Sequence, residues 1–436
     1  MRNTVSRHNF STLMLWLLVF LLAGFLPVWA QAKKPSQALQ QVMNRQEEWL
    51  EGFDRELRDG KVQAHEWEAR AEALRQFAAT RAADFKLADW KDDELLALAA
   101  LYQLAESYEP AVVAFRQYLK INPNPKPLAG LNVRVSLVRA LIELEQLTEA
   151  EKALVETIRD HDGPESLSAT YVALYKDLML AQRDRGQLPL AHDLAVRGYE
   201  LAETSKRQRF VAPPLRESIQ RDQLVFAAVG IALKEKLGKQ KDAETVLRRV
   251  RNSELERQPS LRAFFDSELA AARLIGSPAP EPVIQRWLPG QGQAETALPK
   301  KLSDLRGKVV LLDFWAMWCG PCIAAFPSLR DWQTKFASRG FAVVGVTRFY
   351  GRSDEREDLS REQEWQGLQA YQRKYKLNYP FAVGKMDDIT NDELYGITGV
   401  PVMVVVDRQG NIRYIKRGVG EYRKFEKRIQ ALLDEK

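Results

Sequence analysis

The stretch that decides the fold runs Lys308-Val309-Val310-Leu311-Leu312-Asp313-Phe314-Trp315-Ala316-Met317-Trp318-Cys319-Gly320-Pro321-Cys322. Its apolar half predicts a buried strand over 309–315, and the residues from Pro321 onward predict a helix. The two cysteines are the only ones in a chain of 436 residues. A Cys-X-X-Cys pair between a strand and a helix is typical of a redox-active dithiol.

The first 32 residues predict a secretory signal peptide. Two arginines precede an uncharged apolar run over 13–26, and small residues follow at Ala30 and Ala32. This order of charge, apolar run and small residues is that of a cleaved leader. An uncleaved anchor is the alternative, because the uncharged stretch over 10–32 is long enough to span a bilayer. In both cases we expect the rest of the chain to be exported, either free in the periplasm or anchored to the inner membrane and facing it.

Charge and cysteine content exclude several classes of function. The net charge of +6 falls to +4 without the two leader arginines, and the remaining charges are interspersed, so we expect no nucleic acid partner.

Disulfides persist in exported proteins. A single disulfide across a four-residue loop stabilises a fold by only roughly 2 kcal/mol, so a structural role does not explain the pair.

The sequence lacks the residues that a zinc site or a Cys–His hydrolase would need. A zinc site requires two more ligands, but there is no third cysteine, and the four histidines all lie before the last domain. A Cys–His hydrolase fails for the same reason, because no histidine follows His192. We therefore expect no metal and no cofactor other than the redox-active disulfide Cys319–Cys322. A peroxidase stays conceivable, although it usually keeps its resolving thiol elsewhere.

Residues 33–275 predict an α-helical domain built from helix pairs. The second helix of each pair contains a small residue, and a large residue follows it four positions later most clearly in Ala111 with Phe115 and Ala150 with Leu154. This pattern resembles tetratricopeptide repeats, in which the small residue lets two helices approach closely. The spacing between the small residues drifts upward, which indicates degenerate repeats or, alternatively, a generic helical array. Both interpretations give a solenoid-like domain. The small residues of the four pairs are Ala111, Ala150, Ala191 and Ala243.

The chain changes character after the helical part. Alternating prolines predict a semi-extended linker over 276–290. In the last domain, 291–436, strand-like runs alternate with helical ones, and a Gln409-Gly410-Asn411 turn joins two strands. This order predicts an α/β sheet that ends in a hairpin. The expected strands cover 309–315, 341–346, 402–407 and 412–416, and the expected helices cover 321–339, 361–376 and 422–433.

The position of Cys319 favours a reactive thiolate. The first turn of a helix carries partial positive charge on unpaired N–H groups, and in such motifs the thiol pKa falls toward or below about 7. Pro321 suits that turn, because its missing N–H loses no hydrogen bond there. Cys322 lies one turn further on. This arrangement supports attack by one sulfur on a disulfide and release of the mixed disulfide by the other.

The segment 313–322 resembles the active-site segment of thioredoxins almost letter for letter. Pro327 matches the proline that kinks the following helix in that family, and 395–401 resembles the stretch that ends in its cis-proline. The leader, a front segment and an extra stretch over 354–379 point to the exported TlpA/ResA-like branch. The resemblance covers the last domain, and the helical part lies outside it.

The resemblance implies a role for each matching residue. Cys319 is the attacking thiol and Cys322 the resolving thiol. Val400-Pro401 is a cis peptide that faces the cysteines, and its backbone pairs with an extended substrate. Asp313 is a buried acid that accepts a proton as Cys322 is activated; a satisfied core polar group is the alternative.

The residues between and beside the cysteines complete the substrate-binding set. Trp318, together with Gly320 and Pro321, shapes the rim of the site, and plain packing is the alternative for Trp318. Two positions depart from the family. The partner lysine of the buried acid has no match in 341–347, where Arg348 is the nearest base just past the strand. Val402 stands where a threonine often follows the cis-proline.

The direction of electron flow is the open question. Gly320-Pro321 between the cysteines resembles the reducing members of the superfamily. A strong oxidant needs an unusually stabilised reduced form, and the motif contains no cation to supply one. We therefore expect a protein-disulfide reductase, with an oxidase or isomerase as the alternative.

The expected partners are protein disulfides and a membrane-borne electron donor, because an exported reductase must be re-reduced. A further protein partner is expected on the helical repeat. An exported adaptor or scaffold built on the repeat, with secondary redox activity, is the alternative from a different class of function.

Overall fold

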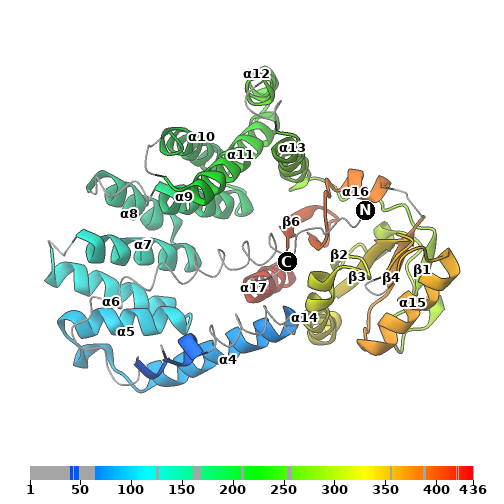
Figure 1. The fold of residues 1–436 in the computed structure, drawn as a ribbon, viewed down its shortest axis with the longest axis horizontal. Helices are drawn as coiled ribbons and strands as arrows, with labels where there is room; N and C mark the ends of the chain where they lie inside the picture. Colours follow the sequence, from blue (N-terminus) through cyan, green and yellow to red (C-terminus); the bar gives the residue numbers. More distant parts are fainter. Residues whose placement is uncertain are drawn as a thin grey trace, which may run out of the picture. The chain divides into compact units, whose positions relative to one another are not determined.

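The structure is a computed structural model that describes residues 40–42, 44–48, 64–123, 127–160, 168–207, 211–252, 258–353, 356–385, 389–418, 420 and 422–435. The predicted signal peptide lies outside these residues. Among the helices that the structure describes, none is long and apolar enough to cross a membrane. Figure 1 follows the chain by colour from its N-terminal to its C-terminal end.

The chain divides into two compact units. The first contains Met1–Val62 and Glu66–Gln223, and the second contains Gln63–His65 and Leu224–Lys436. The sequence places a boundary at the linker 276–290, whereas this division falls inside one long helix, α11 (Pro213–Lys236). One cause is that α13 (Pro259–Leu274), which precedes the linker, contacts the domain that follows it, since Ser267 forms a hydrogen bond with Gly396.

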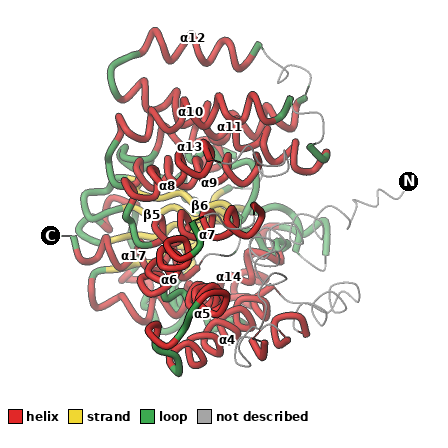
Figure 2. The backbone as a smooth tube through the Cα atoms, turned by 90° about the vertical axis from the view of Figure 1, so that its left-hand side faces the viewer, coloured by secondary structure: helices red, strands yellow, loops and turns green. Residues whose placement is uncertain are grey.

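The first unit is rich in helices, as the sequence predicts. Helix formers dominate its sequence and strand-like alternation is absent. Neighbouring helices pack on each other in chain order, α5 on α6, α6 on α7, α7 on α8 and α9 on α10. Figure 2 shows the described residues of this unit as helices joined by short loops. The helices are α4 (Ala64–Ala83), α5 (Asp92–Leu104), α6 (Tyr108–Ile121), α7 (Pro127–Glu143), α8 (Leu147–Asp160), α9 (Ser168–Asp184) and α10 (Leu188–Ser205), with the short η1 (Leu87–Asp89) after α4.

The turns between paired helices repeat one geometry. Each contains a residue with positive φ, and the residue after it donates its N–H to a carbonyl five positions earlier, which closes the end of the first helix. Each of these residues lies five positions before one of the predicted small residues, and all four alanines are fully buried. The helical part is therefore a series of similar helix hairpins. The turn residues are Glu106, Glu145, Gly186 and Gly238.

The second unit holds the predicted α/β sheet. The six strands found among its described residues are ordered β1-β4-β3-β2-β5-β6. Strands β2, β3 and β4 are parallel, and β1, β5 and β6 run antiparallel to their neighbours. The strands are β1 (Arg286–Leu288), β2 (Val309–Phe314), β3 (Phe341–Arg348), β4 (Phe381–Gly384), β5 (Val402–Val406) and β6 (Ile412–Arg417).

The helices of this unit agree with the sequence where their patterns are long. The three predicted helices are present within three residues of their expected ends, and the short α16, like strands β1 and β4, was not predicted. The helices are the end of α11, α12 (Gln240–Arg251), α13 (Pro259–Leu274), α14 (Gly320–Phe336), α15 (Arg361–Lys374), α16 (Thr390–Leu394) and α17 (Tyr422–Asp434), with short turns η4 (Glu295–Ala297), η5 (Leu302–Leu305) and η6 (Ala337–Arg339).

Each face of the sheet carries its own core. Alternate residues of β2 point to opposite faces. Val309 and Leu311 lie in a cluster with side chains of α14, α15 and α17, and this cluster contains both cysteines. Val310 and Leu312 lie in a second cluster with residues of the segment before β2. The end of β2 leads to the start of α14 through residues 315–319.

Candidate active site

The two cysteines occupy the first turn of α14. Cys319 is the N-cap residue, and its Sγ accepts a hydrogen bond from the backbone N–H of Cys322 at 3.2 Å. Pro321 lies in the first turn, where no N–H partner is required. The sulfurs form a disulfide, and Cys319 is 4% exposed while Cys322 is fully buried. Of the two cysteines, Cys319 alone retains any exposed surface.

Asp313 lies beneath the same helix. Val309, Leu311 and Asp313 are every second residue of β2, so the side chain of Asp313 points to the same face as the other two, the face that carries the cysteines. It is fully buried, and among the described residues neither carboxylate oxygen has a hydrogen-bond partner. Burial raises the pKa of Asp313 to about 8, because the charged form loses its solvation. A satisfied core polar group does not describe this residue.

Tyr379 is a second buried polar group on this face, and the sequence pattern did not single it out. It is fully buried in the cluster that holds the cysteines, and its hydroxyl also has no partner among the described residues. Burial raises the pKa of Tyr379, and the charge of Asp313 raises it further. No local motif marks Tyr379, because it follows a helix and precedes a strand only four residues long.

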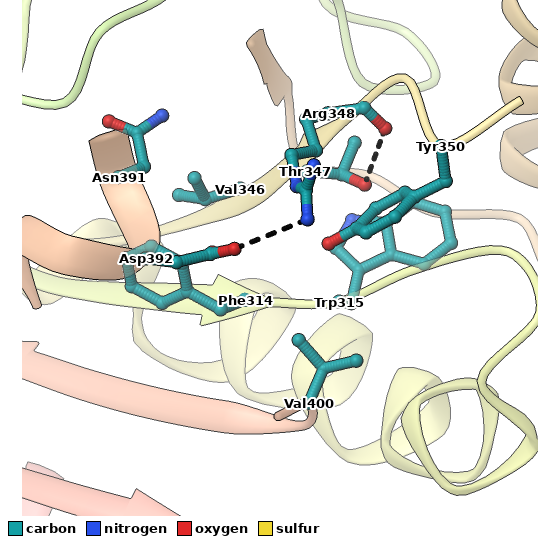
Figure 3. Close-up of a pocket in the computed structure, with 9 residues that line it drawn as sticks. All are labelled: Phe314, Trp315, Val346, Thr347, Arg348, Tyr350, Asn391, Asp392 and Val400. Carbon is teal, nitrogen blue, oxygen red and sulfur yellow. Dashed lines mark hydrogen bonds and ion pairs between the residues drawn. The ribbon is translucent and has the colours of Figure 1, made fainter. Parts of the chain in front are cut away.

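Arg348 does not replace the missing lysine. It is the last residue of β3, and its guanidinium pairs with Asp392 at 3.5 Å. It also lies over the ring of Tyr350, 4.4 Å from the centroid. Figure 3 shows Arg348 between these two residues in a small cavity, with Val400 on the opposite wall. Burial is the cause of the raised pKa of Asp313, and no cation of the described residues lowers it.

Trp318 is held from two sides. Tyr350 meets it edge to face with centroids 5.5 Å apart, and the guanidinium of Arg352 lies 4.2 Å from its ring centroid. The loop that carries both partners is fixed by Glu364, which is 1% exposed. Its carboxylate accepts hydrogen bonds from the backbone N–H groups of Tyr350 and Gly351 at 2.9 Å. In sequence, Glu364 resembles an ordinary acid in the first turn of a helix, so its role could not be found there.

The segment before β5 has the expected backbone. The Val400–Pro401 peptide is cis, and Val400 packs against the cluster that contains the cysteines. The carbonyl of Pro401 accepts a hydrogen bond from Gly418 N at 2.9 Å. Val402, which stands where a threonine often follows the cis-proline, is buried and pairs with Phe314 across the sheet. Thr398 and Gly399 are exposed.

Comparison with known proteins agrees with this geometry. The AhpC/TSA family matches residues 275–415. The thioredoxin-like protein YneN of Bacillus subtilis is 30% identical over 128 residues, which are 29% of this chain and 67% of that protein. The chain belongs to the thioredoxin-like family. The thiol–disulfide oxidoreductase ResA of Geobacillus thermodenitrificans is 22% identical over 169 residues, 39% of this chain and 83% of that protein.

Among solved structures, the thioredoxin domain of a thiol–disulfide oxidoreductase from Bacteroides vulgatus is 26% identical. The alignment covers 36% of this chain and 97% of that domain, with a TM-score of 0.28.

The thioredoxin-like domain thus gathers most of the predicted site residues. Cys319, Cys322, Asp313 and Val400 border one cluster at the ends of β2 and α14. Gly320 is exposed, while Trp318 and Pro321 are half-buried at the rim. The structure adds residues whose contacts depend on the tertiary fold, namely Tyr379, Tyr350, Arg352 and Glu364.

Proposed function

We propose that this chain is a thiol–disulfide oxidoreductase that reduces protein disulfides through Cys319 and Cys322. The observation that carries the proposal is a disulfide at the N-terminus of α14 with a buried, unpartnered Asp313 on the same face of the sheet. The thioredoxin-like family and the similarity to ResA support a redox enzyme. Gly320-Pro321 between the cysteines and the lack of a cation in the motif support the reducing direction.

In the first step the reduced enzyme uses Cys319 as the nucleophile. The thiolate is favoured by the N–H groups of the first turn of α14, and Cys322 N already donates to this sulfur. Cys319 Sγ attacks one sulfur of the substrate, the substrate S–S bond breaks, and a mixed disulfide forms. The leaving sulfur takes a proton from solvent and is released as a thiol.

In the second step Cys322 resolves the mixed disulfide. Its buried thiol gives its proton to the carboxylate of Asp313, whose pKa of about 8 allows proton exchange near neutral pH. Cys322 Sγ then attacks Cys319 Sγ, the mixed disulfide breaks, and the second substrate sulfur leaves and is protonated. Two electrons pass to the substrate, and the Cys319–Cys322 disulfide forms.

The substrate lies along the segment that ends in Pro401. The exposed Thr398 and Gly399 and the backbone of Val400 offer an edge to which an extended polypeptide can add. Trp318, with Gly320 and Pro321, borders the sulfurs and sets which segments approach Cys319. In this proposal, substrate recognition takes place on both sides of the disulfide.

The remaining parts of the proposal concern the localisation of the protein and its partners. The leader supports export, so a membrane-borne donor must return electrons to the disulfide after each turnover. The helix hairpins of the first unit, with buried alanines after each turn, are consistent with tetratricopeptide-like repeats that recruit a protein partner.

The Cys322→Ser variant tests the proposal. Without the resolving thiol, substrate proteins should stay bound to Cys319 as mixed disulfides that dithiothreitol releases. Non-reducing electrophoresis followed by mass spectrometry identifies them, and the double variant Cys319→Ser, Cys322→Ser is the matched control. The proposal fails if no thiol-sensitive adduct forms and if the reduced wild type leaves a model protein disulfide intact.

A further inference from the structure

The last helix before the linker makes a direct contact with the segment that precedes the cis-proline. Ser267 lies on α13 and is 4% exposed. Its hydroxyl donates a hydrogen bond to the carbonyl oxygen of Gly396 at 2.8 Å, although the two residues are 129 positions apart in the chain. A buried hydroxyl with this partner fixes both the helix and the segment.

Arg417, the last residue of β6, joins the same contact. Its Nη2 donates to the carbonyl oxygen of Ser267 at 2.9 Å, to Ser267 Oγ at 3.0 Å and to Gly396 O at 3.3 Å. Its Nη1 pairs with Glu268 at 3.1 Å, and the two side chains are 26% and 19% exposed. A guanidinium that is largely shielded from water and divided among four acceptors holds its partners more firmly than a surface ion pair does.

Gly396 itself is adapted to this contact. Its φ is +63°, which favours glycine, and a Cβ built on it would lie 2.6 Å from the Cβ of Ala270 on α13. Any other residue would push the helix away from the segment. The close approach of α13 is therefore a second observation, independent of the polar contacts.

The other end of the segment is anchored next to Arg417. Gly418 N donates to the carbonyl of Pro401 at 2.9 Å. The residues between the two anchors include the exposed Thr398 and Gly399. Residues 396–401 thus form a short bridge, fixed at Gly396 by α13 and Arg417 and at Pro401 by the residue after Arg417.

We propose that Ser267, Glu268 and Arg417 are positioning residues for the substrate, so that α13 is part of the recognition site of the thioredoxin-like domain. The proposal rests on the proposed function. An extended polypeptide adds to the backbone of 398–400, and hydrogen bonds of that kind require the strand to be placed within a fraction of an ångström. A small disulfide reaches Cys319 without this pairing, so the contact selects for protein disulfides.

Two variants and one matched control test this in the full chain. Ser267→Ala removes the hydroxyl. Arg417→Lys keeps the positive charge opposite Glu268 but removes the planar guanidinium whose Nη2 donates to Gly396 O. The control is Arg273→Ala on the same helix, where Arg273 donates to Glu235 at 2.9 and 2.6 Å and contacts no part of 396–401 in the described structure.

The assay compares two disulfides, the first reduced with dithiothreitol as the electron donor and the second by enzyme that has been reduced and then freed of dithiothreitol, because dithiothreitol itself reduces small aromatic disulfides. One is insulin, a polypeptide disulfide, and the other is the small aromatic disulfide dithiobis(nitrobenzoate). Loss of one neutral hydrogen bond predicts a rise of about fivefold in KM for insulin with Ser267→Ala and at least that with Arg417→Lys. We expect kcat for insulin and the rates with the small disulfide to match wild type, and Arg273→Ala to change neither.

Hydrogen exchange of the amides of Gly396 and Ile397 provides a readout that does not depend on activity. These amides donate to Glu393 O at 3.2 Å and Asp392 O at 2.7 Å. Their exchange should accelerate in Ser267→Ala and Arg417→Lys and stay at the wild-type rate in Arg273→Ala.

Three results overturn the inference: an unchanged KM for insulin, an equal loss with both disulfides, or unchanged exchange in both variants. A wild type that leaves insulin disulfides intact would instead refute the proposed function. In that case the exchange rates alone decide whether α13 holds the segment.

Discussion

Replacing Asp313 with asparagine removes an acid that the folded protein cannot solvate. The carboxyl is fully buried, no described residue donates a hydrogen bond to it, and its pKa rises from 3.8 to about 8. Between these two values the folded state holds a proton that the unfolded state has lost. The free energy of unfolding of the wild type therefore falls as the pH rises from about 4 to about 8, and the contribution is fully lost above that range.

The size of the effect follows from the shift. Each pH unit in this window removes about 1.4 kcal/mol from the stability of the wild type, and by pH 7 the total is about 4 kcal/mol. The asparagine side chain of the variant carries no charge at any of these pH values. Asp313→Asn should therefore match the wild type near pH 4 and exceed its stability by up to about 4 kcal/mol at pH 7.

The assay must report on the thioredoxin-like domain alone, because a chain with two compact units need not unfold in one step. We suggest urea unfolding at pH 4.5 and pH 7.5 with pulsed hydrogen exchange, read by mass spectrometry in peptides from β2, β3 and β5. The control is Asp407→Asn, since Asp407 accepts a hydrogen bond from Asn411 N at 2.8 Å and faces Arg413 at 3.6 Å. That variant should lose stability.

A stability difference between wild type and Asp313→Asn that is absent at pH 7.5, or that does not grow between the two pH values, refutes the reasoning. Such a result would mean that the carboxylate is solvated or paired in solution.

Two further predictions concern the same site. Glu364→Gln should weaken the hydrogen bonds from the backbone N–H groups of Tyr350 and Gly351. It should therefore lower the stability of the domain by about 1–3 kcal/mol and change the fluorescence of Trp318. The control Glu362→Gln, at an exposed residue on the same turn, should change neither the stability nor the fluorescence. The resolution of a mixed disulfide on Cys319, followed by stopped-flow release of a chromogenic thiol, should accelerate as the pH rises through about 8, because the carboxylate of Asp313 becomes available as a base. Asp313→Asn should remove that inflection, and an unchanged profile in the variant would exclude Asp313 as the proton acceptor.

The sequence predicted the parts of this molecule that are encoded locally. The apolar run before Cys319 and the helix formers after it lie side by side in the chain, so β2 and α14 could be predicted with their ends nearly correct. Strands β1 and β4 contain three and four residues, which is too short for a periodic pattern to emerge from the surrounding loops.

The residues that the sequence missed depend on contacts between distant segments. Glu364 is polar on a polar helix, and only the fold shows that it is buried against the backbone of Tyr350. Ser267 lies in the helical part, which looked separate from the sheet because a proline-rich linker follows it. Its bond to Gly396 crosses 129 residues, and no pattern within either segment reports it.

The most direct test of the central claim, that Cys319 and Cys322 pass electrons to protein disulfides, is the reduction potential of this pair. The full chain is equilibrated with dithiothreitol or glutathione buffers at pH 7, quenched, alkylated and weighed to count free thiols. The account predicts a potential more negative than about −200 mV, on the side of thioredoxin at about −270 mV. A value near that of the oxidant DsbA, about −120 mV, would contradict it.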